Sequence, residues 1–210
     1  MDSLHTTMGA SALLSLALFA FVNSITPGPN NVMLTASGAT FGYRPTLPHM
    51  LGISLGTAGM LLVVGAGLGT LFTRWPQLYH WLQVVGAVYL LWLAYKIAQS
   101  GQVEQGAARA KPFTFWQAAA FQWVNPKAWI MTVGIVAAYT PQEGFVWNLL
   151  LATLILAGVN FPCISVWTLF GSAVGRALRT QRSLQYFNWL MAFLLVLSLL
   201  PIAQEWWQAR

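Results

Sequence analysis

Residues 24–33, SITPGPNNVM, decide the fold of this chain. The stretch places two prolines and a glycine inside a run that carries no charged residue between Asp2 and Arg44. Proline lacks an N–H and clashes with the carbonyl group four residues earlier, so a regular helix cannot continue through residues 26–29. In lipid the freed backbone groups are costly unless a polar cavity or packed protein satisfies them. We therefore expect a broken helix that lines a cavity, with a turn at the membrane edge as the alternative.

The composition around this stretch is that of a membrane protein. Hydrophobic residues make up 57% of the 210 residues and charged residues 7%, where a soluble domain carries about 25% charged residues. So few charged side chains cannot cover a soluble surface, and most of the outer surface must face lipid. The start of the chain has no Lys or Arg, so we interpret its first apolar run as a retained span and not as a signal peptide.

Six apolar runs are long enough to span a membrane, which takes about 20 residues. We expect an all-α polytopic membrane protein with six transmembrane helices in a single domain over residues 1–210. The first run begins near Ser11 and reaches the break at 26–29; the others cover residues 48–71, 78–98, 115–139, 146–170 and 187–202.

The basic residues of the loops predict the orientation of these spans. An excess of Lys and Arg marks the cytoplasmic side, and we therefore expect both termini outside. The net charge of +6 is explained in the same way, so nucleic acid is not an expected partner. With six spans, Arg44, Lys96, Arg109, Lys111, Arg176, Arg179 and Arg182 fall on one side, and Arg74, Arg210, Glu143 and Glu205 on the other.

The two halves of the chain have the same layout. Pro27 and Pro126 are 99 residues apart, and the same offset places Gly59 on Gly158. Three spans, a polar linker at 100–111 and three further spans predict a 3+3 inverted repeat, with half-repeats at about 9–99 and 112–203. Helices 1 and 4 are then the broken ones. Inverted repeats are common in transporters, whose sites lie near mid-membrane at broken helices.

The second break is QWVNPKAW, residues 122–129, near the middle of the fourth run. A Lys at this depth costs about 2.5–3.5 kcal/mol on insertion scales, which makes Lys127 a functional residue by default. The six runs contain no Asp or Glu. The expected partners of Lys127 are therefore carbonyl groups freed by the breaks, Asn side chains, water or a substrate carboxylate. A purely structural Lys is the alternative.

Two further features lie within the runs. Asn160 and Pro162 occur in GVNFPCIS of the fifth run, and the asparagine either bonds a neighbouring helix or lines the site. GISLG, residues 52–56, has glycines four apart, a pattern typical of close helix packing within or between subunits. Packing of this face between subunits would permit a homodimer.

Several chemistries have no basis in the sequence. There is no Walker motif, and GAGLGT at 65–70 lacks the third glycine of a dinucleotide fingerprint. His5, His49 and His80 are scattered, and the single cysteine, Cys163, excludes an internal disulfide and a thiolate cluster. Since no catalytic constellation stands out, we expect neither an enzyme, a cofactor nor a metal site. A membrane enzyme would need clustered His, Asp or Glu near one interface.

The chain resembles the LysE/RhtB family of bacterial amino-acid exporters. The resemblance rests on ITPGPNN in the first run, GISLG in the second, GAVYLLWLAYKI in the third and KPFTFWQAAAFQWVNPKAW at the fourth. It covers most of the chain and is nearest to the members that export cysteine and O-acetylserine. It implies an inner-membrane, proton-driven exporter of small amino acids, with lipid, protons and substrate as its partners. Some relatives that export basic amino acids have acidic residues within the membrane, and this chain has none, so a neutral substrate of the cysteine, O-acetylserine or threonine/homoserine class is expected.

We therefore expect alternating access between the two halves, with the substrate carboxylate near Lys127 and the amides after Pro29. The substrate ammonium would meet carbonyl groups freed at the breaks. Lys127 is also the first candidate to carry the coupling proton, and His49 a distant second. An uncoupled channel or scaffold protein is the alternative function. The expected substrate-binding residues are Asn30, Asn31, Asn125, Lys127 and Asn160, and the expected helix-break or gating residues are Pro27, Gly28, Pro29, Pro126 and Pro162.

Overall fold

The computed structural model describes residues 8–68, 74–100, 111–178 and 180–208, and the regular elements within these ranges are all helical. This confirms the all-α class. Residues 1–7, the linker at 101–110, Arg109, Arg179 and Arg210 lie outside the described part. The helices are α1 (Ala10–Ile25), α2 (Pro29–Phe41), α3 (Tyr43–Val63), the π-helical turn η1 (Val64–Leu68), α5 (Pro76–Gln99), α6 (Phe115–Gln122), α7 (Pro126–Tyr139), α8 (Phe145–Ala177), α9 (Gln181–Leu197) and α10 (Leu200–Gln208).

Three helical segments of the described residues are long and apolar enough to cross a membrane: Tyr43–Leu68, His80–Gln99 and Phe145–Ala177. The pair α1 and α2, bent by 55° at its break, adds a fourth if it forms one span. The other expected runs are each divided into two shorter helices, α6 with α7 and α9 with α10. The chain is thus a multi-pass helical membrane protein.

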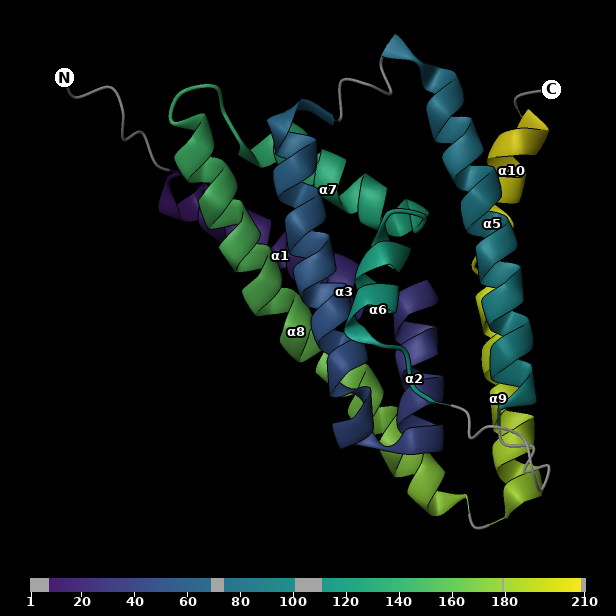
Figure 1. Ribbon diagram of the computed structural model, residues 1–210. Coiled ribbons are helices and arrows are strands. Elements are labelled where there is room, and N and C mark those ends of the chain that lie inside the picture. Colours follow the sequence, from purple (N-terminus) through teal and green to yellow (C-terminus); the bar gives the residue numbers. More distant parts are fainter. Residues whose placement is uncertain (1–7, 69–73, 101–110, 179, 209–210) are drawn as a thin grey trace.

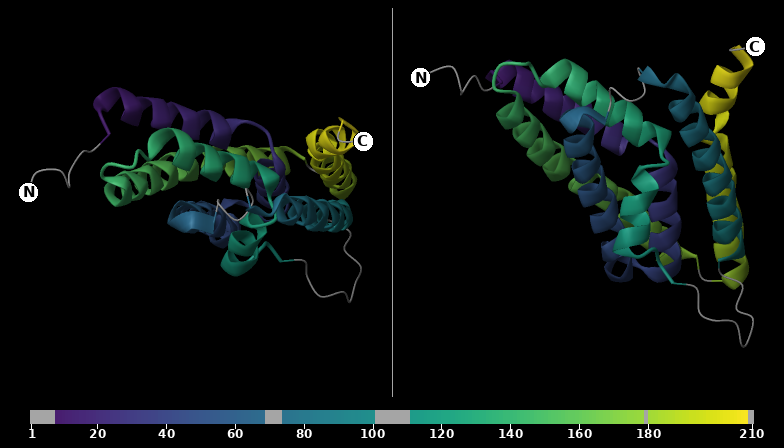
Figure 2. Two further views of the ribbon diagram at one scale, coloured as in Figure 1. Left: turned by 90° about the horizontal axis from the view of Figure 1, so that it is seen from above. Right: turned by 45° about the horizontal axis from the view of Figure 1, so that its top comes forward.

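The helices run back and forth between two ends of the molecule. In Figure 1, α1 begins and α7 and α10 finish at the upper end, whereas α2, α5 and α8 finish at the lower end. The order of elements is the same in both halves: a broken helix, a long helix and a further helix. Figure 2 shows α1 and α7 side by side, at a slant to the other helices.

The breaks arise where the residue before a proline is extended. Thr26 (φ −68°, ψ 146°) ends α1, and Pro29 begins α2 directly after the extended Gly28. Asn125 (φ −90°, ψ 109°) precedes Pro126, the first residue of α7. Steric contact with the proline ring disfavours a helical conformation at the preceding residue. Both predicted breaks are therefore confirmed.

No break occurs at Pro162, because α8 continues through this residue, and of its two predicted roles only gating stays a prediction. Pro48 likewise lies inside the unbroken α3. The residues before these prolines are Phe161 and Leu47, neither of which can cap a new helix. Asn125, in contrast, accepts a hydrogen bond from the Lys127 N–H with its side chain, as a residue at a helix N-cap does.

Glycines bring pairs of helices into backbone contact. A Cβ atom added at Gly38 would lie 2.3 Å from the Thr168 carbonyl oxygen, and one added at Gly171 would lie 2.1 Å from the Thr35 carbonyl oxygen. These contacts join α2 to α8 over their length. No side chain larger than hydrogen fits at either position without moving the helices apart.

The GISLG face packs against α6 of the same chain. A Cβ atom at Gly52 would lie 2.3 Å from the Phe115 carbonyl oxygen, and one at Gly56 would lie 2.7 Å from the Cα atom of Ala119. The predicted close helix packing is confirmed, and it occurs within the subunit. The face that would have permitted a homodimer is therefore occupied.

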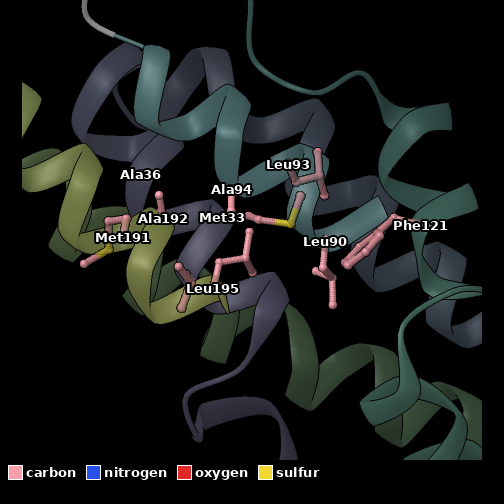
Figure 3. Packing of buried hydrophobic residues seen from close by; sticks show 10 residues of the cluster. Met33, Ala36, Leu90, Leu93, Ala94, Phe121, Met191, Ala192 and Leu195 are labelled. Atoms are coloured by element: carbon pink, nitrogen blue, oxygen red, sulfur yellow. The ribbon is translucent and has the colours of Figure 1, made fainter. Parts of the chain in front are cut away.

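Other contacts are made by side chains. In one cluster, Met33 of α2, Leu90 of α5, Phe121 of α6 and Leu195 of α9 are buried together (Figure 3). A second cluster buries Leu16, Ile135 and Leu156 between α1, α7 and α8. The pair α5 and α9 is further joined where Asn188 Nδ2 donates to the Ser100 carbonyl oxygen (2.6 Å).

Candidate functional site

The two helix breaks meet at Lys127. Its Nζ atom donates to the carbonyl oxygen of Thr26 (3.0 Å), to the Thr26 Oγ1 atom (2.8 Å) and, at a longer distance, to the carbonyl oxygen of Pro27 (3.4 Å). The last carbonyl groups of a helix have no partner within that helix, and the negative end of its dipole attracts a cation. The ammonium of α7 therefore satisfies the carbonyl groups freed where α1 ends.

Gly28 gives the lysine side chain the space to reach these acceptors. A Cβ atom at Gly28 would lie 3.0 Å from Cδ and 3.2 Å from Nζ of Lys127. The backbone at Gly28 is extended (φ 179°), so other residues can adopt its conformation. The requirement for glycine comes from the neighbouring lysine and not from the backbone.

A small cavity lies where the breaks meet. Its volume is about 30 Å³, room for about two water molecules, so it does not hold an amino acid in this conformation. Among the described residues that line the cavity, Lys127 is the only one with an ionisable side chain. All five predicted substrate-binding residues line it: Asn30, Asn31, Asn125, Lys127 and Asn160.

Two of these asparagines hold the first break in place. Asn31 Nδ2 donates to the carbonyl oxygens of Ser24 and Thr26, both at 2.8 Å. Asn30 forms a reciprocal amide pair with Gln122, with Asn30 Nδ2 to Gln122 Oε1 at 2.9 Å and Gln122 Nε2 to Asn30 Oδ1 at 3.2 Å. Both side chains thus have protein partners already, and a substrate would have to share or replace them.

Gln122 is a site residue that the sequence analysis did not select. It is fully buried, lines the cavity and accepts a further hydrogen bond from Thr57 Oγ1 (3.3 Å). The pair that it makes with Asn30 joins the two breaks. An uncharged amide inside an apolar run is the signal that could have found it, because such groups usually bond a neighbouring helix.

Asn125 and Asn160, the remaining predicted asparagines, make different hydrogen bonds with their side chains. Asn125 caps α7 with its side-chain oxygen, 3.1 Å from the Lys127 backbone nitrogen. Asn160 Nδ2 donates to the Ser24 Oγ atom (3.0 Å), which brings α8 to the end of α1. The Asn160 Oδ1 atom is buried and has no hydrogen-bond partner.

His49 lies outside this site. Its ring is buried in α3, is not among the residues that line the cavity, and contacts the Phe113 ring with 5.2 Å between centroids. Within the described residues, no three His, Cys, Asp or Glu side chains come together in a group that could hold a metal ion.

Comparison with known proteins agrees with this arrangement. The LysE type translocator family matches residues 21–199, which include both breaks and the cavity. The chain belongs to the LysE family.

Individual LysE relatives cover most of the chain. The cysteine/O-acetylserine efflux protein of Salmonella typhimurium (strain LT2) is 33% identical over 181 residues, 85% of this chain and 90% of the relative. The protein of the same name from Escherichia coli (strain K12) is 32% identical over the same shares. No solved structure matches the chain at a significant level. Membership and these relatives support amino-acid export as the function and confirm the resemblance found in the sequence.

Proposed function

We propose that this LysE-family protein is a proton-driven exporter of small neutral amino acids or their derivatives, of the cysteine, O-acetylserine or threonine/homoserine class. It acts in the bacterial inner membrane by alternating access between two three-span halves, arranged as an inverted repeat with both termini outside. The repeated order of elements and the start of α1 and finish of α10 at one end of Figure 1 support this arrangement. Arg44, Lys96, Arg176 and Arg182, in terminal turns at the opposite end, support its orientation.

The contact between Lys127 and the first break is the observation that carries the proposal. It places a cation in a cavity beside the start of α2, which has no side-chain cap. The first N–H groups of a helix favour an anion. A substrate carboxylate is therefore attracted from two sides, by the ammonium and by the helix start.

The charge of the cavity favours a neutral substrate. Among the described residues that line the cavity there is no Asp or Glu. A lysine or arginine substrate would bring a second cation next to Lys127 without a carboxylate to offset it. A zwitterionic substrate carries its own carboxylate, which offsets the charge of its ammonium.

The size of the cavity supports alternating access. A volume of about 30 Å³ is too small for an amino acid, so substrate entry requires the helices around the breaks to separate. Because Lys127 belongs to the second half and Thr26 to the first, such separation opens the contact between the halves.

The proton gradient supplies enough energy for export. Each charge moved through 100 mV is worth about 2.3 kcal/mol, roughly a 40-fold concentration gradient. Lys127, as the ionisable residue of the cavity, is the candidate that carries the proton.

The experiment uses purified protein in liposomes with radiolabelled O-acetylserine, cysteine or threonine inside and an imposed pH gradient. We expect efflux to increase with the gradient and to fall to the passive level when an uncoupler is added. Efflux that ignores the gradient would instead indicate an uncoupled channel. Absence of efflux for all three substrates would indicate a scaffold protein, and either result would overturn the proposal.

A further inference from the structure

One buried oxygen of the cavity has no partner. The Asn160 side chain is 5% exposed, and its Oδ1 atom accepts no hydrogen bond. A buried acceptor without a donor is costly, and native structures rarely leave one without a reason. Because Asn160 is one of the residues that line the cavity, a donor group of a bound ligand can supply the missing bond when the cavity opens.

The Asn160 amide is held in a fixed orientation. Its Nδ2 atom donates to the Ser24 Oγ atom at 3.0 Å, and Ser24 lies in the last turn of α1. The amide nitrogen thus bonds the first half of the chain. The oxygen on the other branch of the same amide has no hydrogen-bond donor.

In this conformation the carbonyl groups of the first break are engaged by protein donors. The Thr26 oxygen already accepts from Lys127 Nζ and from Asn31 Nδ2, which uses both of its lone pairs. The Pro27 oxygen also faces Lys127. The meeting of a substrate ammonium with these freed carbonyl groups stays a prediction, and Asn160 Oδ1 is a second acceptor that lacks a donor.

We propose that Asn160 Oδ1 receives the α-ammonium of the substrate, while Lys127 and the start of α2 receive its carboxylate. This inference rests on the proposed export function and specifies how the cavity residues recognise the substrate. The protein then selects free α-amino acids over analogues in which the amine is absent or acylated.

Matched ligand pairs test the ammonium contact directly. L-Cysteine and 3-mercaptopropionate differ only in the α-ammonium, as do L-homoserine and 4-hydroxybutyrate. Calorimetric titration of the full chain in lipid nanodiscs gives the affinity for each ligand. We expect wild-type protein to bind the ammonium-bearing member of each pair at least about tenfold more tightly, since hydrogen bonds to charged groups are the strong ones. N-Acetylcysteine should bind no better than 3-mercaptopropionate.

Two substitutions at Asn160 should change this ratio in opposite directions. Asn160→Ala removes the acceptor and should reduce the ratio to less than about threefold. Asn160→Asp adds a negative charge at the same place and should raise the ratio. The thermal unfolding temperature of each variant shows whether it is folded, and if Asn160→Ala does not fold, Asn160→Asp decides alone.

The results separate this inference from the proposed function. If wild-type protein binds neither amino acid, the export proposal fails and the ammonium site with it. If wild-type protein binds the amino acids but Asn160→Asp leaves the ratio unchanged or lower, the ammonium site alone is wrong. A ratio that Asn160→Ala leaves at the wild-type value overturns it equally.

Discussion

The two helix breaks differ in how their free backbone groups are satisfied. At the first break, α1 ends in carbonyl groups that accept from Lys127, and α2 starts without a side-chain cap. At the second break, α7 starts with its own cap, Asn125, and carries the lysine. One break therefore offers backbone groups to a charged partner, and the other supplies that partner. Each break thus depends on the other for these hydrogen bonds.

The helices on either side of the breaks also differ in how they pack. Helix α2 contacts α8, and α6 contacts α3, through glycines that leave no room for a side chain. Helices α1 and α7 are held against α8 by side chains such as Leu16 and Ile135. Glycine contacts fix one position along a helix, whereas side chains in rotamers can repack. The pairs α2 with α8 and α3 with α6 are thus the more rigid contacts, and the side chains of α1 and α7 have more room to repack.

Lys127→Met should have the largest effect on transport. The substitution keeps the length of the side chain but leaves the Thr26 and Pro27 carbonyl groups without their charged donor, and hydrogen bonds to charged groups contribute about 1.5–3 kcal/mol each. We expect O-acetylserine efflux from liposomes to fall at least about 100-fold. Lys96→Met is the matched control, because Lys96 is exposed on α5. Unchanged efflux in Lys127→Met would remove the lysine from the mechanism.

Gly171→Ala should destabilise the rigid pair of α2 and α8. The added methyl group would lie 2.1 Å from the Thr35 carbonyl oxygen, and overpacking of this kind costs about 1–3 kcal/mol. We expect a lower thermal unfolding temperature in detergent. Gly158→Ala on the same helix has no atom within 4 Å of its new methyl group and should leave stability unchanged or raise it. Equal melting of the two variants would contradict the glycine contact.

Gly28→Ala tests the contact between the breaks without removing a charge. The methyl group at 3.0 Å from Lys127 Cδ forces the flexible lysine to shift, so its ammonium loses part of its bonding to Thr26. We expect roughly tenfold slower efflux, about 1.4 kcal/mol, with little change in the unfolding temperature. Gly59→Ala, where nothing lies within 4 Å, should transport normally. A large loss of stability in Gly28→Ala would show that the glycine serves the fold.

Asn125→Ala should have the smallest effect on stability and efflux. It tests whether Asn125 only caps α7 or also positions Lys127. Loss of a helix N-cap costs about 1 kcal/mol of stability. Thr114→Ala removes the comparable cap of α6, whose side chain accepts from Gln117 N, and should reduce stability by a similar amount. Only Asn125→Ala should also reduce efflux, because Asn125 holds the backbone of Lys127. Equal efflux in both variants would assign Asn125 a capping role alone.

The sequence was sufficient to predict the breaks and the partner of Lys127. Proline acts on the residues beside it, so local rules locate both breaks. Because the apolar runs contain no Asp or Glu, the expected partners of the buried lysine were freed carbonyl groups, Asn side chains, water or a substrate carboxylate, and Thr26 supplies a carbonyl group. The packing face at Gly52 and Gly56 was also predictable from its spacing.

Other features depend on how distant helices align, which the spacing of residues does not fix. The amide pair of Asn30 and Gln122 and the contact of Gly171 with Thr35 join segments from different parts of the chain. The wrong break at Pro162 has a local reason. A helix restarts after proline where the preceding residue can cap it, as Asn125 does, and Phe161 cannot.

The ammonium of Lys127 has three protons and three oxygen atoms of the first break within reach. A carboxylate that approaches it has to displace at least one of these oxygens. Under the proposed function, substrate binding and loosening of the contact between the halves are then a single event. In the absence of substrate, the same three hydrogen bonds hold the two halves together.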